Sequence, residues 1–167
     1  DLHLSLRRQR QMCIRDRGGG FEGGKTEDRL SSLIDIPPTL LSMAGIPIPS
    51  TYMGVDLTVQ IDNPDQKRDC VFIQISEASN SRAIRTDRFK YEVRDLAITG
   101  YAHHQSKVYF ENYLYDLKKD PNEKNNLIKD PRYSHVRQEL KYLLLKQMAN
   151  AQEEAPVILP SIIKRRK

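Results

Sequence analysis

The chain has 167 residues, of which 38% are hydrophobic and 29% charged, so its length and composition indicate about one globular domain and argue against a disordered chain. No apolar run approaches the ~18 residues that cross a bilayer, and the start lacks the apolar core of a signal peptide. The net charge of +5 comes from the ends, because residues 1–17 carry +3 and residues 164–167 carry +4. We therefore expect no membrane span, and no nucleic-acid binding by the folded part.

The first 17 residues contain five arginines and show no trustworthy helical or strand period. The run Met12–Arg17 looks like a translated sequencing-adapter remnant. A basic arm for nucleic acid or anionic lipid is the alternative, but it would need interleaved aromatics or amphipathic spacing, and neither is present. We expect residues 1–17 to be a non-native extension whose deletion leaves thermal stability unchanged.

Residues 18–25 are glycine-rich, and Gly19 to Thr26 satisfies the bare spacing of a phosphate-binding loop. The strand that should precede such a loop is missing, and the residues after Thr26 do not start an apolar helix. A surface turn is the favoured interpretation.

A short buried helix is predicted after residue 35. Leu30–Ile34 forms a strand-like apolar entry, and Asp35 is placed to cap the helix. Pro37 and Pro38 fall in the first turn, where a missing N–H costs little. Gly45 can adopt the left-handed conformation that ends a helix.

Four strands are predicted from alternating apolar side chains, near residues 70–76, 81–86, 88–94 and 108–117. Together they should form a small antiparallel sheet. Cys70, at the start of the first strand, is more consistent with a small packed residue than with a nucleophile.

The connection 95–107 contains the only candidate substrate contacts, His103 and His104. Adjacent side chains in an extended segment point to opposite sides, so the two histidines do not form a chelating pair. No Asp or Glu lies between Asp95 and Glu111 to complete a metal site. Exposed loop histidines are the favoured interpretation, and substrate contact is the alternative.

A long helix is predicted over residues 131–150, opened by Asp130 as a cap and Pro131 at the first position. Its apolar residues form one stripe that should cover one face of the sheet, with His135 exposed at the edge. The stripe consists of Val136, Leu140, Leu143, Leu144 and Met148. The predicted fold class is therefore α+β, a small antiparallel sheet packed by a long C-terminal helix.

Three segments in order also carry a family resemblance: Leu30–Ile46, Arg82–Tyr91 and Tyr113–Leu127. The last contains Leu-Tyr-Asp-Leu, a charged turn, Asp-Pro and Asn-Leu. The set resembles the C-terminal subdomain of the sulfatases, in the alkaline-phosphatase-like superfamily. The resemblance implies that residues 18–68 leave a catalytic domain, 69–150 form the sheet and helix, and 151–167 form an extended basic tail.

Sulfatases hydrolyse sulfate esters with a formylglycine made in a Cys/Ser-x-Pro-x-Arg motif, aided by a divalent cation, usually calcium. Arg15 stands where the motif after Cys13 needs Pro, and Cys70–Gln74 lacks both Pro and Arg. We therefore expect no catalytic residue, no metal ligand and no cofactor in this chain. Its expected role is structural support or one wall of the substrate cleft.

The resemblance also implies partners: an N-terminal catalytic domain, and a sulfated small molecule or glycan. A periplasmic or extracellular location is typical of the family. Two alternatives remain, a C-terminal part of a related phosphonate or phosphodiester hydrolase, and an independent anion-binding module. Alone, the chain should be inactive and should self-associate through apolar side chains that include Leu33, Ile34, Leu40 and Leu41.

Overall fold

The computed structural model describes residues 28–63, 67–76, 79–96 and 105–162. The chain divides into two compact units, Asp1–Arg68 and Asp69–Lys167. The predictions for residues 1–17, for the glycine-rich segment 18–25, and for His103 and His104 lie outside the described residues.

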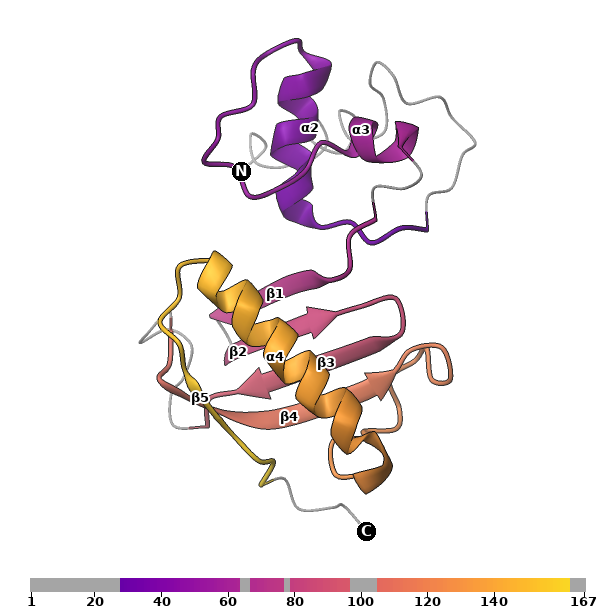
Figure 1. Cartoon of the computed structure of the whole chain (residues 1–167), viewed down its shortest axis with the longest axis vertical. Coiled ribbons are helices and arrows are strands. Elements are labelled where there is room, and N and C mark those ends of the chain that lie inside the picture. The colour runs from indigo at the N-terminus through magenta and orange to yellow at the C-terminus, as the bar shows by residue number, and fades with distance from the viewer. Residues whose placement is uncertain (1–27, 64–66, 77–78, 97–104, 163–167) are drawn as a thin grey trace, which may run out of the picture. The chain divides into compact units, whose positions relative to one another are not determined.

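The described part of the first unit is helical (Figure 1). A 3-10 turn, η1 (Leu33–Asp35), leads into α2 (Ile36–Met43), and α3 (Leu57–Asp62) follows after a loop. The expected strand-like entry Leu30–Ile34 is therefore wrong, since residues 30–32 form no strand and Leu33 and Ile34 belong to η1. The short helix α3 was not predicted, and it begins where the Asp56 carboxylate accepts a hydrogen bond from the backbone N–H of Thr58.

Helix α2 ends as predicted at Gly45, which has φ of 68°. The backbone N–H of Ile46 donates to the carbonyl of Leu41, and that of Gly45 donates to Ser42. These two bonds satisfy carbonyls that the last helical turn leaves free. The helix is less buried than expected, since only Pro38 and Thr39 are buried along it.

The second unit is a five-stranded sheet with strand order β1-β2-β3-β4-β5. Its first four strands are β1 (Val71–Ser76), β2 (Asn80–Arg85), β3 (Phe89–Arg94) and β4 (Val108–Asp116). All four pair antiparallel with their chain neighbours, which confirms the predicted sheet. A short fifth strand, β5 (Val157–Leu159), pairs parallel with β4 within the segment expected to be only an extended tail.

Helix α4 (Ser134–Asn150) lies across one face of this sheet (Figure 1), after a 3-10 turn, η2 (Pro131–Tyr133). The Asp130 carboxylate accepts a hydrogen bond from the backbone N–H of Arg132, as its predicted capping role requires. His135 is exposed, also as predicted.

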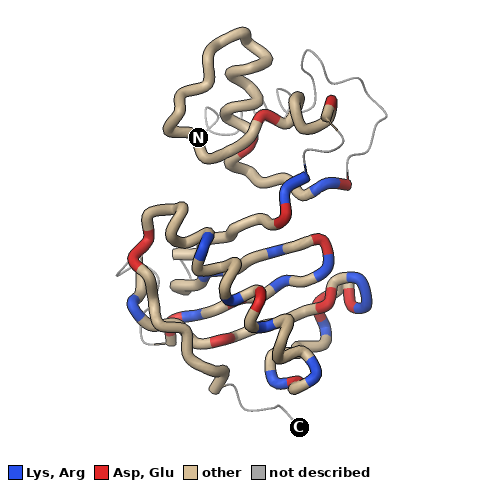
Figure 2. Tube along the Cα trace, viewed as in Figure 1, with Lys and Arg blue, Asp and Glu red and all other residues tan. Residues whose placement is uncertain are grey.

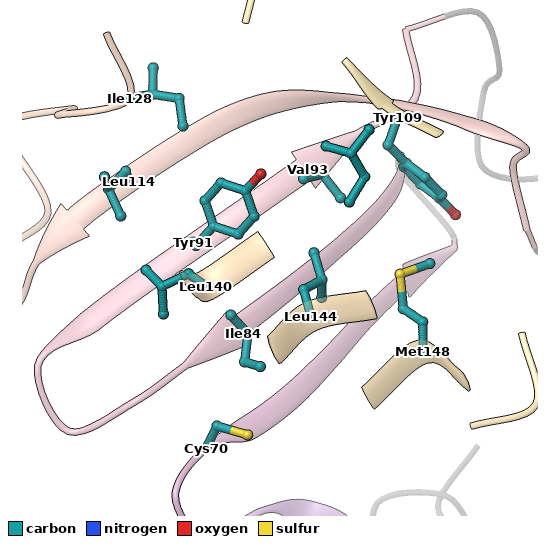
Figure 3. Close-up of a cluster of buried hydrophobic side chains, with 11 residues drawn as sticks. Cys70, Ile84, Tyr91, Val93, Tyr109, Leu114, Ile128, Leu140, Leu144 and Met148 are labelled. Atoms are coloured by element: carbon teal, nitrogen blue, oxygen red, sulfur yellow. The ribbon is translucent and has the colours of Figure 1, made fainter. Parts of the chain in front are cut away.

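The core of the second unit lies between α4 and the sheet (Figure 3). Leu144 and Met148 of the predicted stripe meet Ile84, Tyr91 and other inward-facing strand residues, all buried. Cys70 is free and buried in the same cluster, so its predicted packing role is confirmed. Each fully buried large apolar side chain contributes roughly 1.5–3 kcal/mol, which makes this cluster the main source of stability in the unit.

Beyond the three residues that pair with β5, the outer edge of β4 is completed by a turn. Asn126 accepts hydrogen bonds from the backbone N–H groups of Leu114 and Ile128, at 3.1 Å each, through its side-chain oxygen. Its amide nitrogen donates to the carbonyl of Asn112 at 3.0 Å, and the N–H of Leu127 donates to the carbonyl of Leu114. The Asn-Leu pair that closes the recognised motif therefore takes the place of a neighbouring strand.

Candidate functional site

Buried charged groups form several clusters in the described part of the chain, and three of them contain an arginine–carboxylate pair within 2.9 Å, one in the first unit and two in the second. Each cluster shows which hydrogen bonds and ion pairs its polar residues make within the fold. His103 and His104, the sequence-predicted substrate contacts, are not among them because they lie outside the described residues.

The first cluster surrounds Asp35, which is 0% exposed. Its carboxylate accepts two hydrogen bonds from the Arg68 guanidinium, at 2.6 and 2.9 Å, in the paired geometry that gives arginine–carboxylate bonds their strength. It also accepts from the backbone N–H groups of Ser32 and Val55. The prediction that the Asp35 side chain caps α2 is wrong: Asp35 holds the cap position but makes no side-chain bond to that helix.

The loop before α3 lies close to this cluster. A Cβ atom at Gly54 would stand 1.9 Å from the carbonyl oxygen of Ile34, so only glycine fits there. Thr39 joins the two helices, since its hydroxyl donates to the carbonyl of Asp35 and accepts from the N–H of Leu57. The cluster is a structural hub that holds η1, α2 and the Met53–Val55 loop together.

The second cluster surrounds Arg82 of β2. Its Nε donates to the Glu153 carboxylate at 2.7 Å, and both side chains are buried. Its Nη1 donates to the Asn80 side chain and to the carbonyls of Ile75 and Ser81. Since a buried charge is tolerated only when paired and hydrogen-bonded, these contacts explain how an arginine fits inside the unit.

Tyr109 extends this cluster toward the centre of the sheet. Its hydroxyl donates to the Asn80 side-chain oxygen at 3.2 Å, and its ring lies 5.9 Å from the Arg82 guanidinium carbon. Burial raises the pKa of Tyr109 above its ordinary value. A tyrosine with a raised pKa stays protonated at neutral pH, so it serves here as a hydrogen-bond donor.

The third cluster contains the aspartate of the recognised Leu-Tyr-Asp-Leu motif. The Asp116 carboxylate is 1% exposed and accepts from the Arg88 guanidinium at 2.9 Å. These hydrogen bonds hold the pKa of Asp116 below its ordinary value. The backbone carbonyl of Asp116 accepts from the N–H groups of Lys119 and Asp120, so the residue also shapes the following turn.

These clusters do not fit the groups that the sulfatase resemblance implies. Within the described ranges, no three His, Cys, Asp or Glu side chains lie together in a way that could hold a metal ion. The carboxylates of Asp35, Asp116 and Glu153 are each engaged by an arginine. No step of sulfate-ester hydrolysis is therefore derived through calcium or formylglycine on these residues.

None of the helices among the described residues is long and apolar enough to cross a membrane.

Comparison with known proteins shows which family has this architecture. The family model described as "N-sulphoglucosamine sulphohydrolase, C-terminal" matches residues 12–150. A Delta 4,5-hexuronate-2-O-sulfatase of Bacteroides thetaiotaomicron is 33% identical over 119 residues, which are 66% of this chain and 22% of that protein.

Solved structures share the fold. The structure of a 2-O GAG sulfatase superposes with a TM-score of 0.62 at 28% identity, over 81% of this chain and 29% of that one. The phosphonate monoester hydrolase of Agrobacterium radiobacter superposes with a TM-score of 0.52 at 27% identity, over 73% of this chain and 25% of that one. The chain thus spans less than a third of the length of these proteins.

The fold and these matches define a C-terminal region of the sulfatase class, with the alkaline-phosphatase-like architecture. Within that class, the chain belongs to the N-sulphoglucosamine sulphohydrolase C-terminal family, whose model covers most of its length. The sequence-based recognition of a sulfatase C-terminal region is confirmed.

Proposed function

We propose that this chain is the C-terminal part of a sulfatase that hydrolyses sulfate esters of a saccharide. In this proposal the chain supports the catalytic domain and forms part of the wall of the substrate cleft. The nucleophile, the calcium site and the sulfate-binding cations belong to the N-terminal part. His103 and His104 remain the proposed substrate contacts of the wall.

The match of the C-terminal family model over residues 12–150 carries this proposal. A relative named for a hexuronate 2-O-sulfate and a structure named for a 2-O GAG sulfatase both support a saccharide substrate. The ion pairs of Asp35, Asp116 and Glu153 support the proposed structural role, because a carboxylate held by arginine is less free to accept a proton from a substrate.

The exposed side chains of the first unit support a docking role. Leu33 is 82% exposed, and Ile34, Leu40 and Met53 are also exposed. Ile34 and Met53 flank the close approach at Gly54, so their side chains belong to neighbouring segments. Exposed apolar groups in this density mark a surface that another part of a protein covers. We propose that the N-terminal catalytic domain covers this surface.

Activity assays on two forms of the protein test the proposal. The isolated chain should hydrolyse 4-nitrophenyl sulfate at the background rate, with or without calcium and a formylglycine-generating enzyme, because a cleft wall alone does not lower the barrier. The protein encoded by the complete reading frame should hydrolyse a 2-O-sulfated or N-sulfated saccharide. Turnover by the isolated chain that is lost on mutating Cys70 or His103 would reveal an active site in the chain and overturn the proposed division of roles.

A phosphonate or phosphodiester hydrolase is the second candidate, supported by the superposition on the phosphonate monoester hydrolase. The complete protein should then prefer a phenyl phosphonate monoester over 4-nitrophenyl sulfate. The preference between these two substrates decides between the candidates.

A secreted or periplasmic location is proposed on the family resemblance alone. Fractionation of the native host, with detection of the complete protein, tests it.

A further inference from the structure

The sheet of the second unit has two unlike faces. Helix α4 covers the face that carries Ile84, Tyr91 and Leu114. Because side chains alternate along a strand, the residues between these positions lie on the opposite face. We call this opposite face, which is not covered by α4, the open face.

The strand register arranges the open face in rows. One row runs Arg85, Lys90 and Tyr115 across β2, β3 and β4. The next row runs Ala83, Glu92 and Tyr113, and a third places Ser81 beside Arg94 and Phe110. The small, buried residues Ser81 and Ala83 of β2 therefore lie between the charged strand β3 and Ile73 and Ile75 of β1, and β3 separates them from the aromatic strand β4.

The aromatic strand presents a stacked pair. The rings of Tyr113 and Tyr115 lie 5.6 Å apart between centroids, with an interplanar angle of 19°. Tyr113 is exposed and Tyr115 half-buried. Because the two rings stack on each other, their outer faces and edges remain for the apolar C–H face of a sugar ring.

Two cations on the same face as this tyrosine pair are available to a ligand, Arg94 on the neighbouring strand β3 and Arg85 on β2, two strands from Tyr115. Arg85 and Arg94 are exposed, and neither makes an ion pair with another residue in the part of the chain that the structure describes. By contrast, Lys90 donates to Glu123 at 2.7 Å, and Glu92 accepts a hydrogen bond from Asn112. In β2, Arg85 is four residues from Ser81, which pairs with Arg94, so the two arginines are separated by about 13 Å along the strands.

The open face differs from the surface proposed to dock the catalytic domain. Figure 2 shows charged residues distributed along the strands of the second unit, whereas the described helices of the first unit contain few. Charged residues are depleted from the centres of buried protein interfaces. The strand register places Arg85, Lys90, Glu92 and Arg94 on the open face, and these charges suit a charged, partly solvated ligand.

We propose that the open face binds a sulfated glycan, with sugar rings stacked on Tyr113 and Tyr115 and sulfate groups held by Arg85 and Arg94. Guanidinium groups bind oxyanions such as sulfate through paired hydrogen bonds. The choice of a sulfated glycan over another anionic ligand rests on the proposed function. The face acts by binding alone and performs no chemistry.

Nucleic acid, which also combines stacking with charge, is less well matched. A single strand carries one phosphate per nucleotide, and proteins that bind it line the path with cations. Here the charged strand contains Glu92 between its two cations. Widely spaced cations around an aromatic pair suit a glycan that is sulfated at only some positions.

Titration calorimetry of the full chain with a size-defined heparin oligosaccharide tests the proposal. The basic ends of the chain will bind heparin in any variant, so the measurement is the difference between variants at fixed salt. Tyr113→Ala combined with Arg94→Gln should lower the affinity about tenfold.

The matched control removes one tyrosine and one positive charge from the helical face. Tyr142 is 72% exposed and Lys146 is exposed, both on α4. Tyr142→Ala combined with Lys146→Gln should change the affinity less than about twofold. Tyr113→Phe, which keeps the ring, should retain most of the affinity, and melting curves verify that each variant is folded.

If the two double variants change the heparin affinity equally, binding occurs through the basic ends, and the proposal is overturned. Equally tight binding of de-sulfated heparin, or of a single-stranded nucleic acid, would overturn the assignment to sulfated glycans. If Tyr113→Ala with Arg94→Gln leaves the heparin affinity unchanged while the complete protein still hydrolyses a saccharide sulfate, the open face has no such role and the proposed function stands.

Discussion

The two units of the chain place their apolar side chains differently. In the second unit Ile84, Tyr91 and Leu144 are fully buried, whereas Leu33 and Met53 of the first unit are largely exposed. The first unit is held instead by the polar hub of Asp35 and Arg68. A short helical segment cannot enclose much apolar surface, so hydrogen bonds to one buried carboxylate fix its shape.

Leu144→Ala should have the largest effect, because it removes a fully buried side chain between α4 and the sheet. We expect the free energy of unfolding of the second unit to fall by about 3–4 kcal/mol. Urea unfolding followed by circular dichroism measures this loss. Tyr142→Ala, on the exposed side of the same helix, is the control and should cost less than about 0.5 kcal/mol.

Arg68→Met tests the hub of the first unit. It leaves the buried Asp35 carboxylate without its charge partner, which costs about 3 kcal/mol. The loss should appear as faster hydrogen exchange at the backbone N–H of Val55, with no change at β2 and β3. Protection lost equally in both units would contradict the separation of their stabilising contacts.

Asn126→Ala should destabilise the edge of β4 by about 2 kcal/mol, since it leaves the Leu114 N–H and the Asn112 carbonyl without these partners. Asn125→Ala is the matched control, because Asn125 bonds through its backbone N–H, which donates to the Asp120 carboxylate. Thermal unfolding compares the two variants. Similar losses would mean that the turn, rather than the Asn126 side chain, completes the edge.

Lowering the pH should produce the smallest loss of folding stability, through protonation of Asp116. The Arg88 guanidinium lowers the pKa of Asp116 in the folded state, so the unfolded state binds the proton more readily. The resulting stabilisation is present above the unfolded pKa of about 3.9 and is lost as the pH falls through the lower folded value. Asp116→Asn should therefore flatten the acid limb of a stability curve. Asp87→Asn, which removes an exposed carboxyl, serves as the control.

The antiparallel sheet and α4 could be predicted from the sequence, because alternation along β1 to β4 and the stripe ending at Met148 are local patterns. The helix-ending role of Gly45 was equally predictable, because it depends only on the φ angle of that residue. The parallel pairing of β5 depends on contacts between residues more than 45 positions apart, and its three residues are too few to show alternation. The partners of Asp35 were missed for the same reason, since Val55 and Arg68 are distant in sequence.

The candidate site was less predictable than the fold. The open face combines Arg85, Arg94 and Tyr113 from three strands, and their proximity follows from the register, including the shift between Glu92 and Val93. A β-bulge changes which side chains are neighbours without leaving a clear signal in composition. The alternation along each strand was visible in the sequence, but the pairing that places two arginines and two tyrosines on one face was not.

The strand order of the sheet also has a consequence for the rate of folding. Since β1 to β4 follow one another in space as they do in the chain, each new strand pairs with the strand before it, across three residues for β1–β2 and β2–β3 and across 13 residues for β3–β4. Sheets built from such local pairings fold faster than sheets built from distant ones. The Arg82–Glu153 pair, whose members are 71 residues apart, should form late, after α4 has packed. Stopped-flow refolding of Glu153→Gln should then show an increased unfolding rate and an almost unchanged folding rate.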